Sequence, residues 1–86
     1  MKDLNYLRKS IDSLDEALIN LLAERMLRVK EVGEYKKQNS IKPLDPKRWQ
    51  EVLDSRKKKA IEREIDPEFI EDIFNLIHEH ALTLEK

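Results

Sequence analysis

Apolar side chains recur at helical spacing through the first third of the chain. From Leu4 to Val32 they stand three or four positions apart, the period of one helix face, with no alternation typical of a strand. Asp3 precedes the run as a suitable N-cap residue, and no proline occurs before Pro43. The pattern therefore predicts one uninterrupted helix from Leu4 to Lys37.

This predicted helix is too long for a compact chain of 86 residues. At about 1.5 Å per residue it spans about 51 Å, whereas a compact chain of this length has a width of roughly 30 Å. Its apolar stripe needs a partner along the whole length, and the remaining residues can supply only two shorter helices. A second copy of the helix is the simplest partner, so we expect a homodimer.

Two further helix starts follow the long helix. Asp45-Pro46 and Asp66-Pro67 each place a capping aspartate before a proline, which is typical of the first turn of a helix. The second helix fades near Glu64, and the third runs to the C-terminus. Its residues expected to face inward are Phe69, Ile70, Ile73, Phe74, Ile77, Ala81, Leu82 and Leu84. The sequence predicts an all-α fold of three helices, one very long, in a single domain over residues 1–86.

The composition narrows the classes of partner. Charged residues make up 41% of the chain, yet the net charge is -1, so no overall field favours nucleic acid or an acidic membrane. The absence of cysteine excludes disulfides and thiolate metal sites, and the two histidines lack the spacing of a zinc pair. No secretion signal and no run of ~20 apolar residues is present. We expect a cytoplasmic protein without a metal.

Two cations share one face near the end of the long helix. Arg25 and Lys36 are eleven residues apart, within about 20° of each other around the axis and about 16 Å apart along it. Val29 and Val32 lie between them on the same face. The pattern predicts a short apolar floor with a cation at each end, and Gly33 beside it leaves room for a neighbouring helix or a ligand.

Arg8 lies about 25 Å from Arg25 on the same helix, too far to join that floor within one chain. The apolar stripe from Leu4 to Val32 is centred on position 18. Pairing two antiparallel copies about that centre sets position 8 level with about position 28. Arg8 of one chain then lies within a turn of Arg25 of the other. We therefore expect an antiparallel homodimer with two equivalent sites, each of which includes Arg8 from the other chain.

These residues resemble the all-helical chorismate mutases along almost the whole chain. The matching segments are Leu7-Arg8-Lys9-Ser10-Ile11-Asp12, Leu14-Asp15, Leu21-Leu22-Ala23-Glu24-Arg25, Glu31-Val32-Gly33-Glu34-Tyr35-Lys36 and Asp45-Pro46-Lys47-Arg48. The resemblance implies an intertwined helical dimer with two sites. It also implies conversion of chorismate to prephenate by an intramolecular Claisen rearrangement in phenylalanine and tyrosine biosynthesis, without a cofactor.

The resemblance also implies roles for individual residues. Arg25, and Arg8 from the other chain, would each bind a carboxylate of the substrate, and Lys36 would donate to the ether oxygen and a carboxylate. Asp45 and Arg48 would lie over the ring and its hydroxyl.

Three positions depart from the commonest pattern of the family. Trp49 stands where a glutamate often contacts the ring hydroxyl, Ala81 stands where a serine is often found, and Glu85 stands where many members use glutamine to donate to the ether oxygen. An ionised carboxylate only accepts hydrogen bonds, so Glu85 must be protonated to donate. We therefore expect activity that rises as the pH falls.

Other readings remain open at this point. The same cationic pocket would suit an isochorismate-pyruvate lyase on the same fold, and the departures at Trp49, Ala81 and Glu85 leave room for a catalytically silent dimer used as a regulatory module. Taken singly, an arginine on an apolar helix face, such as Arg8 or Arg25, more often extends its guanidinium to water than binds a ligand. The sequence also leaves open whether the chain works alone or in a complex with another shikimate-pathway enzyme.

Overall fold

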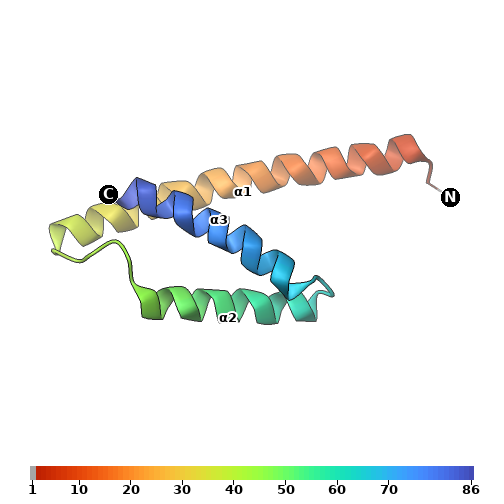
Figure 1. The fold of residues 1–86 in the computed structure, drawn as a ribbon. Coiled ribbons are helices and arrows are strands. Elements are labelled where there is room, and N and C mark those ends of the chain that lie inside the picture. Colours follow the sequence, from red (N-terminus) through yellow and green to blue (C-terminus); the bar gives the residue numbers. More distant parts are fainter. Residues whose placement is uncertain (1) are drawn as a thin grey trace.

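The computed structural model describes residues 2–86, which form three helices joined by two short connections (Figure 1). Helix α1 spans Leu4–Gln38, α2 spans Pro46–Glu62 and α3 spans Pro67–Glu85. No strand occurs in this part of the chain. The predicted all-α fold is confirmed, with helix boundaries within about two residues of those expected, and the dimer stays a prediction because a single chain is present.

All three helices begin at a capping aspartate, as the sequence predicts. Each aspartate accepts a hydrogen bond from a backbone N–H of the first turn: Asp3 from Tyr6 at 2.8 Å, Asp45 from Arg48 at 3.1 Å and Asp66 from Glu68 at 2.9 Å. Such a cap satisfies one of the N–H groups that the helix leaves unpaired. The starts of α2 and α3 are therefore fixed by residues adjacent in sequence.

The first two helices end in the same backbone conformation, which sequence analysis did not predict. Ser40 (φ 54°) and Glu64 (φ 59°) adopt the left-handed backbone conformation that glycine most often adopts at the end of a helix. The N–H of the next residue then reaches back over the last turn: Ile41 to the carbonyl of Lys36 at 2.7 Å, and Ile65 to that of Ala60 at 2.9 Å. These bonds reverse the chain sharply, so the connection after α1 turns back toward that helix.

Helix α3 lies between the other two helices and packs against both, whereas α1 and α2 make no close backbone contact (Figure 1). The N-terminal half of α1 projects beyond α2 and α3 (Figure 1). The described chain measures 57 × 24 × 15 Å with a radius of gyration of 16.3 Å, well above the about 12 Å of a compact chain of this length. The long helix therefore makes the subunit a rod with a helical hairpin at one end.

Few side chains are buried in the single chain. The buried apolar residues are Val52, Leu53, Ala60 and Ala81. Phe69, expected to face inward, is 56% exposed because it lies in the first turn of α3, beyond the reach of α1. No helix among residues 2–86 combines the length and hydrophobicity needed to cross a bilayer.

The apolar stripe of the projecting half of α1 is uncovered. Its exposed members are Leu4, Leu7, Ile11, Leu14, Leu18 and Leu21, each 46–66% exposed. The uncovered stripe lies on the part of α1 that neither α2 nor α3 reaches.

Candidate active site

A cavity of about 330 Å³ opens between the C-terminal half of α1, the start of α2 and the C-terminal half of α3. It forms where α1 and α2 stand apart while α3 packs against both. Its lining combines cations, two carboxylates, apolar side chains and two rings: Arg25, Arg28, Val29, Val32, Lys36, Pro43, Asp45, Arg48, Trp49, Val52, His78, Ala81 and Glu85.

The floor predicted from the sequence of α1 is present in this cavity. Arg25, Val29, Val32 and Lys36 all line it, because residues four, seven and eleven positions apart share one helix face. The two valines lie between the two cations along the helix. A ligand with two negative groups and an apolar body fits this order of side chains.

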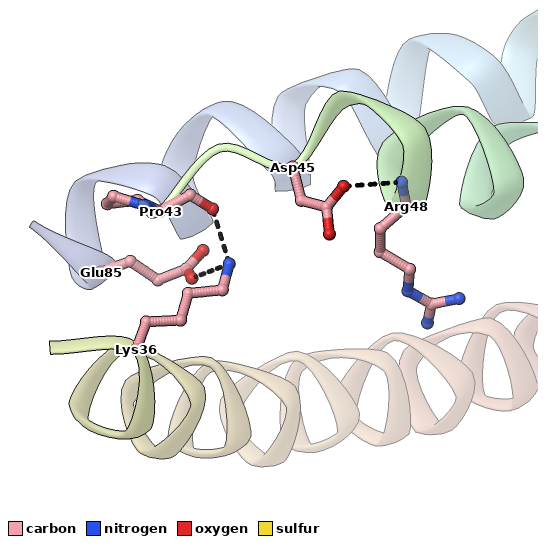
Figure 2. A network of polar contacts seen from close by, with 5 residues as sticks. All are labelled: Lys36, Pro43, Asp45, Arg48 and Glu85. Atoms are coloured by element: carbon pink, nitrogen blue, oxygen red, sulfur yellow. Dashed lines mark hydrogen bonds and ion pairs between the residues drawn. The ribbon is translucent and has the colours of Figure 1, made fainter. Parts of the chain in front are cut away.

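Lys36 is held by contacts from two other parts of the chain. Its Nζ lies 2.7 Å from Oε1 of Glu85 on α3 and donates a 2.6 Å hydrogen bond to the carbonyl of Pro43, as Figure 2 shows. The Lys36 side chain is 18% exposed and that of Glu85 only 9%. The cation and the carboxylate therefore face each other where little water reaches, and their attraction is strengthened.

Lys36 and Glu85 form an ion pair in which the buried Oε1 of the carboxylate faces the ammonium. Apart from this ion pair, Oε1 has no hydrogen-bond partner among the described residues. Glu85 thus keeps unused hydrogen-bonding capacity beside the cavity. Although Glu85 is the penultimate residue of the chain, its side chain is buried and not solvated.

Gly33 explains how the last turn of α3 comes so close to α1. A Cβ atom added to Gly33 would lie 3.0 Å from Cα of Glu85 and 3.3 Å from its Cγ. A side chain at position 33 would therefore collide with the backbone of α3. The one glycine of the chain gives space for a neighbouring helix, and this close packing places Glu85 against Lys36.

Arg25 stands among other cations at the opposite end of the floor. Burial lowers the pKa of its guanidinium, and the positive charges of Arg56 and Arg48 lower that pKa further. Among residues 2–86 no carboxylate forms an ion pair with these three arginines, so their like charges repel one another. A bound anion would relieve this repulsion, and guanidinium suits bidentate contact with a carboxylate.

Asp45 and Arg48 lie at the start of α2, on the more exposed side of the cavity. One oxygen of Asp45 caps α2 by accepting the Arg48 N–H (Figure 2). The cap therefore fixes the position of the Asp45 carboxylate and of the Arg48 backbone together.

Trp49 and His78 form a stacked pair on the cavity wall. Their ring centroids are 3.8 Å apart and their planes differ by 7°. Burial lowers the pKa of His78, and Arg25 and Lys36 lower it further, while Glu85 and Glu79 partly offset that effect. The imidazole is therefore neutral at pH 7.

The cavity brings together most of the residues predicted from the sequence. Those present are Arg25, Lys36, Asp45, Arg48, Trp49, Ala81 and Glu85. Arg8 is exposed on the projecting half of α1, outside this cavity, so its assignment to a partner's site stays a prediction. Sequence analysis missed His78 and Arg28. The position of Arg28 three residues after Arg25 could have placed it at the rim, where it pairs with Glu31 at 2.8 Å.

Comparison with known proteins agrees with this geometry. Residues 7–86 match the family described as "Chorismate mutase type II". The chain is 34% identical over 86 residues to the chorismate mutase of Methanocaldococcus jannaschii, covering 100% of this chain and 87% of that protein. It is 28% identical over 82 residues to the 4-amino-4-deoxychorismate mutase of Streptomyces pristinaespiralis, covering 95% of this chain and 64% of that protein.

A longer relative shows the same similarity over part of its length. The T-protein of Enterobacter agglomerans is 39% identical over 83 residues, which cover 96% of this chain but only 22% of the T-protein. The similarity to a protein of nearly equal length and the match over residues 7–86 are enough to assign the family. This chain belongs to the chorismate mutase type II family.

Proposed function

We propose that this chain is a chorismate mutase, an isomerase that rearranges chorismate to prephenate in the synthesis of phenylalanine and tyrosine. The observation that carries the proposal is the cavity in which Arg25 and Lys36 stand at opposite ends of an apolar floor. Membership of the chorismate mutase type II family supports the same activity.

The chemistry of the rearrangement suits such a cavity. In chorismate an ether C–O bond breaks while a C–C bond forms within the same molecule, so no nucleophile, cofactor or metal is needed. A protein accelerates this step by holding the folded, reactive conformer. It also places hydrogen-bond donors where negative charge grows, at the ether oxygen.

The side chains of the cavity divide these tasks. Arg25 binds one carboxylate, and Lys36 donates to the ether oxygen and to a carboxylate. The buried carboxyl group of Glu85 lies 2.7 Å from the ammonium of Lys36. It donates to the same ether oxygen when it is protonated. Asp45 and Arg48 contact the ring and its hydroxyl from the start of α2.

The second carboxylate of the substrate is bound by an arginine from another subunit. The exposed apolar stripe of α1 favours pairing with a second copy, since small chains with little buried core gain stability by association. An antiparallel copy would place the partner subunit's Arg8 near Arg25. The active form is then a homodimer with two sites, each built from both chains.

A direct assay tests the proposed reaction. The purified protein is incubated separately with chorismate and with isochorismate, and the products are separated by chromatography. Prephenate from chorismate supports the proposal. Pyruvate and salicylate from isochorismate, without prephenate from chorismate, would assign the chain as a lyase, and no product from either substrate would favour a silent helical dimer.

A further inference from the structure

The stacked rings of Trp49 and His78 have no part in the roles assigned above. They come from different helices, α2 and α3, and meet with centroids 3.8 Å apart on the wall of the cavity. Both residues are half-buried. One ring face of each is therefore covered by the other ring, while the pair borders the space where the substrate is expected.

We propose that His78 is a positioning residue of this site, whose ring holds the Trp49 indole as a flat wall for the substrate ring. This inference rests on the proposed mutase function. It assigns Trp49 to substrate contact and His78 to the orientation of Trp49. His78 is thereby a residue that shapes the site through its neighbour.

The surroundings of Trp49 explain why its orientation needs support. Trp49 stands in the first turn of α2. Its backbone N–H donates a 3.0 Å hydrogen bond to the carbonyl of the capping Asp45, so the backbone of Trp49 is fixed. Its side chain faces the gap between α1 and α2, which do not pack closely together. Support for the indole must come from α3, and the parallel ring of His78 supplies it over a whole ring face.

The strength of such support is modest but sufficient to bias one orientation. Aromatic pairs in close contact favour the paired state by about two- to tenfold. A wall that is already in place when the substrate arrives costs less ordering on binding. The effect of losing it should therefore appear mainly in KM.

The charge of His78 depends on groups from every helix around the cavity. The charged residues that line the site or face His78 are Arg25, Arg28 and Lys36 on α1, Asp45 and Arg48 at the start of α2, and Glu79 and Glu85 on α3. Burial and the nearby cations keep the pKa of the imidazole below its ordinary value. The stack seen here is therefore between two neutral rings at pH 7 and gains a charge only in acid.

The fluorescence of Trp49 reports on its stacking with His78. Trp49 is the single tryptophan, and a protonated imidazole in contact with an indole quenches its fluorescence. We expect the fluorescence of the unliganded protein to fall reversibly in acid, with a midpoint below about pH 6.5. The His78→Phe variant should not show this transition. A parent protein whose fluorescence follows the same pH course as His78→Phe would overturn the inference.

Enzyme kinetics at pH 7 test the positioning role. His78→Ala should raise KM for chorismate by about three- to tenfold with little change in kcat, because the indole loses its support. His78→Phe should restore KM to within about twofold of the parent, since a neutral flat ring replaces the imidazole. Asn75→Ala, an exposed change on the same helix, is the matched control.

The outcomes separate this inference from the proposed function. A parent protein that makes no prephenate overturns the mutase proposal, and the positioning role falls with it. A parent that makes prephenate, with His78→Ala at the same KM as Asn75→Ala, overturns only the role of His78. Failure of His78→Phe to restore KM, with circular dichroism showing both variants folded, also overturns it.

Discussion

The ammonium of Lys36 and the carboxylate of Glu85 lie 2.7 Å apart and join the last turn of α1 to the last turn of α3. The same ammonium is bonded to the carbonyl of Pro43, so three segments converge on one positive charge. A substrate oxygen that reaches Lys36 must share it with Glu85. The protonation state of Glu85 therefore decides whether this end of the cavity offers one donor or two.

Replacing Glu85 by glutamine should change the pH dependence of catalysis. In the parent protein, kcat/KM should rise from neutral toward acidic pH, because only a protonated carboxyl donates a hydrogen bond. In Glu85→Gln the amide donates at every pH, so the profile should be flat over that range. A parent profile that is flat, or that rises toward neutral pH, would remove Glu85 from the donor role.

Adding a methyl group at Gly33 should disturb the same corner of the site. The new Cβ lies 3.0 Å from Cα of Glu85, so α3 must move. Overpacking costs about 1–3 kcal/mol, and the gain in helix propensity returns about 1 kcal/mol. We expect Gly33→Ala to lower the free energy of unfolding by about 1 kcal/mol in urea denaturation.

The activity of the same variant provides the second measurement. Because the last turn of α3 carries Glu85, kcat/KM of Gly33→Ala should fall by about tenfold. Ser13→Ala, an exposed change to alanine in the same helix, is the control for helix propensity alone. A Gly33→Ala protein that is more stable than the parent and fully active would contradict the close packing of α1 and α3.

The features that sequence analysis predicted correctly depend on neighbouring residues. Asp45-Pro46 and Asp66-Pro67 begin helices because a capping carboxylate and a fixed proline angle act within one turn. The cavity floor was predictable because helical periodicity alone places Arg25 and Lys36 on one face.

The features that sequence analysis missed depend on contacts between distant segments. Glu85 stands near the end of α3, where a helix usually frays, yet it is only 8% exposed because Gly33 lets α3 pack against α1. The sequence gives no sign that His78 belongs to the cavity, because its ring partner Trp49 lies on another helix. Neither contact has a signal in the local pattern.

Removing the guanidinium of Arg25 should abolish most catalysis without unfolding the protein. Leaving a substrate carboxylate without its buried charge partner costs about 2–5 kcal/mol, so kcat/KM of Arg25→Ala should fall roughly 30- to 5,000-fold. Lys30→Ala removes an exposed cation from the same helix and should keep the parent rate. Sedimentation analysis should show the same oligomer for both. An Arg25→Ala protein with the parent kcat/KM would contradict the proposed site.

Mixing two inactive variants tests whether each site is built from both chains. If the partner subunit's Arg8 completes the site that holds Arg25, then Arg8→Ala and Arg25→Ala should each be nearly inactive alone. After the two proteins are unfolded together in equal amounts and refolded, about half of the dimers contain one chain of each kind. Each mixed dimer has one site with both arginines and one with neither, so about a quarter of the parent activity should return.

Arg8→Ala mixed with Lys30→Ala is the control for the dilution of subunits, because Lys30→Ala keeps both arginines. A mixture of Arg8→Ala and Arg25→Ala that stays as inactive as its components would show that the arginines do not meet across an antiparallel interface.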